Sequence, residues 1–153
     1  MEYYDANTNE KYIPYVIEST YGLDRTFLAV LFESLIVEEL EDGVTRQVLQ
    51  INPFLAPIKA NILPLIKKSH SDKALEIYNE LKKNFMVSYD DAGNIGKRYR
   101  RGDAIGIPCA ITVDNNTLEN GTVTVRERDS MKQSIIDVKD LKDYLFTIVN
   151  AYK

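Results

Sequence analysis

Residues 94–108, Asn-Ile-Gly-Lys-Arg-Tyr-Arg-Arg-Gly-Asp-Ala-Ile-Gly-Ile-Pro, join a strongly basic segment to an apolar one. Four cations fall within the five residues 97–101, around the aromatic side chain of Tyr99. The pattern predicts a short helix that reaches about Ala104 and is followed by a strand. Clustered Arg and Lys suit phosphate oxygens, and an aromatic or guanidinium plane suits an unstacked base. The alternative is a charged helix face that meets only solvent.

Strands and helices alternate before this segment. Buried strands are expected at 58–63, stopped by Pro64, and at 86–89. A helix between them is expected to start at residues 70–72, with Ser71 as its N-cap. The side chains expected to face the core from this helix are Leu75, Tyr78, Leu81 and Phe85.

The pattern after the basic segment predicts a hairpin and a closing helix. Strands are expected at 107–113 and 122–126, joined by a turn at 114–121, with a last short strand at 132–136. Asp137 is expected to cap the closing helix. The apolar face of that helix is expected to consist of Leu141, Tyr144, Leu145, Ile148 and Val149. This order predicts an α/β fold with a mixed β-sheet flanked by helices.

The N-terminal third has a different pattern. Residues 1–10 are polar and turn-rich, which indicates a hairpin tip or a frayed start, and residues 12–18 are expected to form an edge strand. Apolar residues from Leu23 to Ile36 recur at helical spacing, which predicts a helix buried on most sides. Its acidic end at 38–42 should be frayed, with a turn at Gly43 and a short strand at 45–51. A domain boundary between 43 and 53 separates residues 1–45 from residues 52–153.

Composition excludes several classes of protein. The chain of 153 residues has 44% hydrophobic and 27% charged residues, without an apolar run near 18 residues or a secretory leader. We therefore expect no membrane partner and a cytoplasmic location. Cys109 is the only cysteine, which excludes an internal disulfide, and a single histidine leaves a zinc site short of ligands, so no metal site is expected. Residues 1–50 hold 3 Lys/Arg and 10 Asp/Glu, net −7, whereas residues 51–153 hold 16 and 13, net +3. The polyanion partner should therefore meet the C-terminal part.

Other polar residues have two possible roles each. Arg126 and Arg128 lie on one face of a predicted strand, where they suit an RNA loop or an ion pair. Arg25, in the first turn of an apolar helix, suits a phosphate or a bridge to an acidic neighbour such as Asp24. His70 is expected to face solvent in a loop, and Cys109 to be a small core residue.

Residues 15–25, Tyr-Val-Ile-Glu-Ser-Thr-Tyr-Gly-Leu-Asp-Arg, resemble motif 3 of class II aminoacyl-tRNA synthetases. Residues 56–65, 89–108 and 122–129 resemble the anticodon-binding domain of that class, and the combination is most similar to glycyl-tRNA synthetases of the homodimeric type. The resemblance covers nearly the whole chain. It implies the last strand and helix of an antiparallel catalytic domain over 1–45 and an anticodon-binding domain over 52–153.

The resemblance also implies roles for individual residues. Arg25 matches the arginine that binds the ATP phosphates, and Glu18 and Thr20 match positions that hold the ammonium group of glycine. The residues expected to contact the anticodon stem-loop of glycine tRNA are Lys97, Arg98, Tyr99, Arg100, Arg101, Arg126, Arg128 and Asp129. Among these, Lys97, Arg98, Arg100 and Arg101 should neutralise phosphates.

No segment resembles motif 1 or motif 2 of the class, so the chain is expected to be the C-terminal piece of a longer glycine–tRNA ligase. The parent enzyme should be a homodimer that uses glycine, ATP and Mg, whereas this piece alone should bind no cofactor and should not aminoacylate. Two alternatives remain open. One is a stand-alone synthetase-like accessory module that binds RNA or DNA without catalysis. The other is an unrelated α/β domain whose basic helix is only solvated.

Overall fold

A five-stranded sheet forms the centre of the molecule in the computed structural model, which describes residues 2–40 and 43–151. The strand order is β6-β5-β7-β8-β9. The strands are β5 (Ala60–Pro64), β6 (Val87–Tyr89), β7 (Cys109–Val113), β8 (Thr122–Glu127) and β9 (Gln133–Asp137). Strand β5 is parallel to β6 and β7, whereas β8 is antiparallel to β7 and β9. The predicted α/β fold with a mixed sheet is confirmed.

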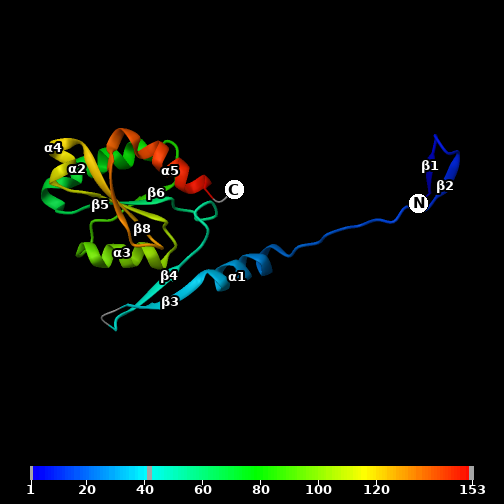
Figure 1. The fold of residues 1–153 in the computed structure, drawn as a ribbon, viewed down its shortest axis with the longest axis horizontal. Coiled ribbons are helices and arrows are strands. Elements are labelled where there is room, and N and C mark those ends of the chain that lie inside the picture. Colours follow the sequence, from blue (N-terminus) through cyan, green and yellow to red (C-terminus); the bar gives the residue numbers. More distant parts are fainter. Residues whose placement is uncertain (1, 41–42, 152–153) are drawn as a thin grey trace.

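Helices cover both faces of this sheet. Figure 1 shows α2 (Lys67–Leu81), α4 (Asn115–Asn120) and α5 (Leu141–Asn150) on one side and α3 (Ile95–Ala104) on the other. The main core lies on the first side, where Ile62, Ile111 and Leu145 are fully buried. Because successive strand residues point to opposite faces, the alternate residues of the same strands meet α3.

Helix α2 begins earlier than predicted. Its first residue is Lys67 and its N-cap is Ile66, so the expected start at Ser71 is wrong. Ser71 instead donates a hydrogen bond from its hydroxyl to the carbonyl of Lys67, 2.6 Å away, from within the helix. The predicted core face is right for Leu81, which is buried, and for Tyr78 and Phe85, which pack against the core, but not for Leu75. Leu75 is 41% exposed, whereas Ala74 and Ile77 are buried.

The segment predicted as a turn at 114–121 contains the short helix α4. Asp114 and Thr117 form a capping box, in which each side chain bonds the backbone N–H of the other residue. Gly121 ends the helix at φ +70°. The capping signal at Asp114 was therefore present in the sequence and was missed.

Asp137 precedes the 3-10 turn η1 (Val138–Asp140), and the N-cap of α5 is Asp140. The prediction that Asp137 caps the closing helix is therefore wrong.

The N-terminal segment extends away from the sheet (Figure 1). Strands β1 (Tyr3–Asp5) and β2 (Glu10–Tyr12) form a small hairpin, as the turn-rich composition indicated. The strand predicted at 12–18 is wrong beyond Tyr12, because residues 13–22 have no strand to pair with among the described residues and are all exposed. Without a partner, β-branched residues alone do not make a strand.

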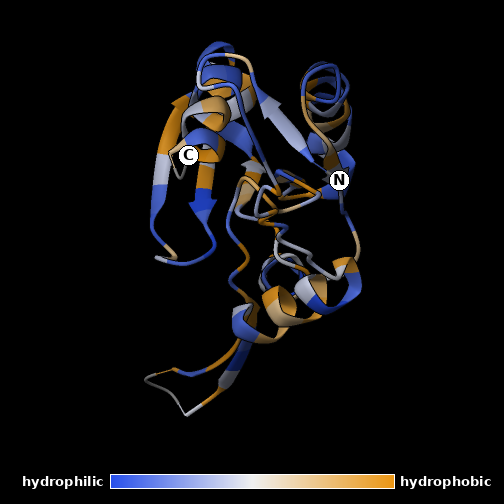
Figure 2. Cartoon of the chain, turned by 90° about the vertical axis from the view of Figure 1, so that its right-hand side faces the viewer, coloured by the Kyte–Doolittle hydropathy of each residue, from blue (hydrophilic) through white to orange (hydrophobic). Residues whose placement is uncertain are grey.

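Helix α1 (Leu23–Ser34) is shorter and more exposed than predicted. None of its residues is buried, and its exposed side chains include Phe27, Leu28 and Phe32. Figure 2 colours the chain by hydropathy, with hydrophobic segments in orange. The chain then enters β3 (Leu35–Glu39), which pairs with β4 (Thr45–Leu49), so the predicted helical conformation at Ile36 and the frayed end after it are wrong. Residues 41–42 of that end lie outside the described residues. The turn at Gly43 is confirmed by its φ of +73° and its N–H bond to the Leu40 carbonyl.

The two-stranded ribbon β3–β4 connects α1 to the sheet domain. Its strand β4 packs against α3. The ribbon spans the region where the division between residues 1–45 and 52–153 was expected, and that division stays a prediction. Across residues 2–40 and 43–151, no helix is long and apolar enough to cross a membrane.

Candidate nucleic-acid interface

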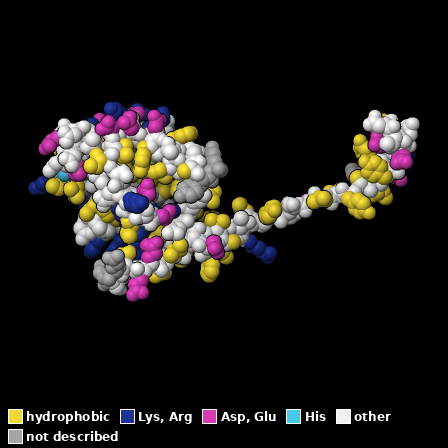
Figure 3. Space-filling view, in the orientation of Figure 1, with side chains coloured by type: hydrophobic (Ala, Val, Ile, Leu, Met, Phe, Trp, Pro, Cys, Tyr) yellow, Lys and Arg dark blue, Asp and Glu magenta, His cyan; other side chains and the backbone are white. Residues whose placement is uncertain are grey.

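Helix α3 carries the basic segment, and its two faces differ in exposure. The helix starts where the Asn94 side chain accepts a hydrogen bond from the backbone N–H of Lys97, at 2.9 Å. Because residues three and four apart share a helix face, Arg98 turns toward the sheet with the buried residues Gly102 and Asp103. The side chains of Lys97, Arg100 and Arg101 are exposed instead, and Figure 3 shows Lys and Arg side chains at the lower left, where α3 lies.

Arg98 is only 4% exposed and holds two parts of the fold together. Its Nη1 donates to the carbonyl of Pro64, at 2.5 Å, and its Nη2 donates to the carbonyl of Gly93, at 2.6 Å. Pro64 ends β5, and Gly93 precedes α3. The guanidinium group therefore positions the loop that leads into the basic helix through its two terminal nitrogens, whereas its buried Nε makes no hydrogen bond among the described residues.

The carboxyl ends of β5, β6 and β7 lie at one edge of the sheet, where α2, α3 and α4 begin. Two acidic residues of the β6–α3 loop bind cations there. Lys67 lies 2.9 Å from Asp91, and this hydrogen-bonded ammonium holds the pKa of the Asp91 carboxyl below its ordinary value. Arg101 lies 2.6 Å from Asp90 and is 47% exposed. Asp90 and Asp91 therefore neutralise part of the positive charge at this edge of the sheet.

Lys97 and Arg100 are different, because neither forms an ion pair within the described part of the chain. Both are exposed on the outer face of α3. Their charges are therefore available to a ligand without first breaking a contact within the protein. Together with the partly satisfied Arg101, they form an exposed cationic row.

Tyr99 and Arg126 form a stacked pair between α3 and the sheet. The Cζ atom of Arg126 lies 4.9 Å from the centre of the Tyr99 ring, a cation–π contact. The Tyr99 hydroxyl lies 2.7 Å from the Thr112 hydroxyl. Arg126 is 7% exposed, and its two terminal nitrogens lie 3.1 and 3.3 Å from the carboxylate oxygens of Asp103. The ion pair considered for Arg126 thus exists, but its acid comes from α3 and not from a neighbouring strand.

Arg128 is 2% exposed and also bonds within the protein. Its guanidinium donates to both carboxylate oxygens of Asp129, at 2.6 and 2.8 Å, and to the carbonyl of Gly106, at 3.0 Å. Asp129 itself is exposed. The predicted anticodon-contacting residues therefore include an exposed group and a buried group, and the buried group connects α3 to the end of β8.

Glu18, Thr20 and Arg25 lie far from this surface, on the extended N-terminal part (Figure 1). All three are exposed. The Thr20 hydroxyl donates to the Glu18 carboxylate at 3.5 Å, and the predicted bridge from Arg25 to an acidic neighbour is not formed among the described residues.

The prediction that His70 faces solvent in a loop is wrong. It is fully buried in α2, because the helix starts at Lys67 and includes it. Its Nδ1 accepts the backbone N–H of Ile66 at 3.0 Å, so the ring proton is on Nε2, which donates to the Asn115 side chain at 2.9 Å. The neutral imidazole therefore joins the starts of α2 and α4 at the carboxyl edge. The signal in the sequence was the position of His70 four residues after Ile66, the N-cap of α2, which lets its ring accept the backbone N–H of Ile66.

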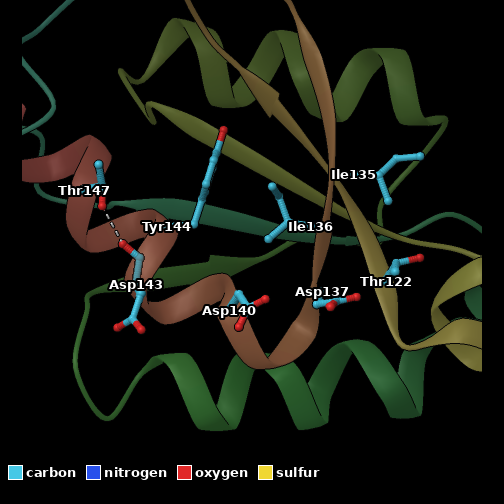
Figure 4. Close-up of a pocket in the computed structure, with 8 residues that line it drawn as sticks. All are labelled: Thr122, Ile135, Ile136, Asp137, Asp140, Asp143, Tyr144 and Thr147. Carbon is cyan, nitrogen blue, oxygen red and sulfur yellow. Dashed lines mark hydrogen bonds between the residues drawn. The ribbon is translucent and has the colours of Figure 1, made fainter.

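A group of three carboxylates lies away from α3, between β9 and α5. Figure 4 shows Asp137, Asp140 and Asp143 around a shallow hollow between β9 and α5. The Thr147 hydroxyl donates to the Asp143 carbonyl there, at 2.9 Å. Lys139 lies 3.2 Å from Asp137 and neutralises part of this negative charge. In the described residues, no group of three or more His, Cys, Asp or Glu is placed to hold a metal ion.

Comparison with known proteins agrees with this geometry. A family model described as "Anticodon binding domain" matches residues 54–147. The glycine–tRNA ligase of Clostridium kluyveri is 53% identical over 145 residues, which are 95% of this chain and 31% of that protein. The glycine–tRNA ligase of Borreliella burgdorferi is 51% identical over 153 residues, which are 99% of this chain and 34% of that protein. The chain thus spans about a third of the length of these relatives.

A solved structure adds support for the fold alone. The RNA binding domain of threonyl-tRNA synthetase from Cryptosporidium parvum Iowa II superposes with a TM-score of 0.59 at 24% identity. The match covers 65% of this chain and 25% of that one.

Proposed function

Because this chain belongs to the anticodon-binding domain family, we propose that its sheet domain binds the anticodon stem-loop of a glycine tRNA. The observation that carries the proposal is the exposed cationic row on α3, within the region that matches the family. No observation favours the alternative of a stand-alone accessory module.

The exposed cations act on the RNA backbone. Lys97 and Arg100 are unpaired within the described residues and neutralise phosphates, and Arg101 exchanges part of its contact with Asp90 for a third phosphate. Each phosphate that is neutralised releases counterions, so binding weakens as salt rises. Positive charge on one helix face therefore gives affinity without base selectivity.

The remaining residues give selectivity and shape. Tyr99 is partly exposed beside the cationic row and offers an aromatic ring for stacking, and the buried Arg126 guanidinium lies against that ring. Arg98 and Arg128, which are almost fully buried, act by holding the backbone of the loops before and after α3. Asp129 is exposed beside Arg128 and accepts hydrogen bonds from a base edge.

The test is a titration with the glycine tRNA anticodon stem-loop at several salt concentrations, beside a loop with altered anticodon bases. Three phosphate contacts predict a slope of log K against log salt of about −2 to −3, and Lys97→Gln or Arg100→Gln should each reduce its magnitude by about 1. The matched control is Lys82→Gln, because Lys82 is exposed at the far end of α2. An equal effect of all three variants would contradict the assignment to α3. Equal affinity for both loops would contradict base selectivity.

The parent enzyme is proposed to be a cytoplasmic glycine–tRNA ligase that works as a homodimer and uses glycine, ATP and Mg. Arg25 would bind ATP phosphates there, and Glu18 and Thr20 would bind the glycine ammonium group. In this chain the three side chains are exposed, so we expect that they do not make an ATP site by themselves. An ATP titration of this chain checks the point, and measurable saturation would contradict it.

A further inference from the structure

A buried cluster of charges connects the β3–β4 ribbon to the proposed RNA-binding face. We define the Asp103 cluster as Glu38, Arg46, Asp103 and Arg126. Asp103, on α3, lies 3.1 Å from Arg46 of β4 and 3.1 Å from Arg126 of β8. Arg46 also lies 3.1 Å from Glu38, its cross-strand partner on β3. One carboxylate is therefore shared by a cation from the ribbon and a cation from the sheet.

The two cations are not bonded equally well. Arg126 forms two hydrogen bonds with the Asp103 carboxylate. Arg46 donates from Nη2 to the carbonyl of Arg128, but its Nε and Nη1 groups are buried and make no hydrogen bond in the described structure, although acids lie within ion-pair distance. Rotation of the Asp103 carboxylate toward Arg46 would satisfy a donor that is unsatisfied now. The cluster therefore has a second arrangement available, in which Arg126 loses its acid.

Arg46, Asp103 and Arg126 are all buried, and Arg126 has the most exposed side chain of the three. Its side chain is 9% exposed, whereas those of Arg46 and Asp103 are 3% and 4% exposed. It also stacks on Tyr99, next to the exposed cationic row. A phosphate or base edge at this face would supply Arg126 with the acceptor that it needs when Asp103 turns away.

We propose that Asp103 couples RNA binding to the ribbon, by turning its carboxylate from Arg126 to Arg46 when Arg126 engages the RNA. The ribbon is then held more tightly against α3. Because β3 follows α1 directly, the same movement reaches the segment that carries Arg25. Coupling is reciprocal. Any change that strengthens or weakens the contact between Arg46 and Asp103 must therefore alter the affinity for RNA. This inference rests on the proposed function.

The test compares Glu38→Gln with Glu39→Gln in the full chain. Both variants remove one negative charge from the same strand, but only Glu38 contacts Arg46, since Glu39 is exposed and forms no ion pair within the described residues. Without Glu38, Arg46 draws more strongly on Asp103, and Arg126 is left to bind RNA. Glu38→Gln should tighten stem-loop binding by about fivefold relative to Glu39→Gln, the lower end of typical coupling.

Hydrogen exchange provides the second measurement. Adding the stem-loop to the wild-type chain should slow exchange at the β4 amides, and Asp103→Asn, where it folds, should remove this protection. If the wild-type chain binds the stem-loop while β4 exchange and the two Glu variants are unchanged, the coupling is refuted and the proposed function stands. If the wild-type chain does not bind the stem-loop at low salt, both are refuted.

Discussion

Replacement of Gly106 by alanine should destabilise the junction between α3 and the ribbon by an amount that the geometry sets. Gly106 has φ +83°, where a residue with a Cβ costs about 1–2 kcal/mol. A Cβ there would lie 2.9 Å from Cγ2 of Ile51 and 3.1 Å from Cδ2 of Leu49, so the neighbours must also move. Overpacking of this kind costs about 1–3 kcal/mol. The total expected loss is about 2–5 kcal/mol in the free energy of unfolding.

Gly121→Ala is the matched control. Gly121 has φ +70°, but its Cβ would meet nothing within 4 Å, so only the conformational cost of about 1–2 kcal/mol applies. The entropy that alanine removes from the unfolded chain is common to both variants and cancels in the comparison. Urea denaturation followed by circular dichroism measures both losses. The double variant with Ile51→Ala should recover part of the Gly106→Ala loss relative to the sum of the single variants.

Equal losses for Gly106→Ala and Gly121→Ala would refute the reasoning, because the contact with the ribbon would then contribute nothing. The same holds if Ile51→Ala and Gly106→Ala are simply additive. In either case β4 would not pack against the turn after α3 as closely as the distances state. The proposed coupling through the Asp103 cluster would then lose its mechanical basis.

Three other predictions follow from single contacts. Burial raises the pKa of the Cys109 thiol from 9.0 to about 12, so this contribution to stability is full below pH 9.0 and declines as pH rises toward 12. Cys109→Ala should remove the decline in an alkaline unfolding series, and rapid reaction of the native thiol with a disulfide reagent near neutral pH would contradict it. His70→Ala should cost at least about 1–3 kcal/mol in urea, because the N–H of Ile66 loses its acceptor, and a smaller loss would show that the bond is dispensable. The pKa of Asp91 is lowered by Lys67, so their contact stabilises the fold above the ordinary value of 3.8 and is lost as pH falls through the lower folded value. Asp91→Asn should flatten the acid limb of the melting-temperature profile, and an unchanged limb would contradict this.

Periodicity predicted the sheet domain well. The β-branched runs at β5, β7 and β8 and the basic helix α3 were located within a few residues, because each has a buried face with a regular spacing. The resemblance to class II synthetases agreed with the family match over residues 54–147. Local signals and tertiary contacts favour the same structure in this part of the chain.

The N-terminal part was predicted less well, for a physical reason. Residues 13–22 have strand-forming side chains but no described partner strand, and residues 35–39 continue an apolar helical pattern but pair with β4. Helix and strand periodicity overlap in short apolar runs, and only the presence of a partner decides between them. His70 was misplaced for a different reason. It was assigned to a loop because the start of α2 was placed at residues 70–72, whereas the helix begins at Lys67.

The sequence by itself determined the α/β class with a mixed sheet, the resemblance that the family match over residues 54–147 confirms, and the presence of a basic helix. Only the tertiary structure decided which cations of that helix are free. Arg98 is held by a carbonyl 34 positions away, and Arg126 by an acid 23 positions away, whereas Lys97 and Arg100 face solvent. Helical spacing shows which residues share a face. Whether a buried charge finds a compensating partner depends on residues that only folding brings together.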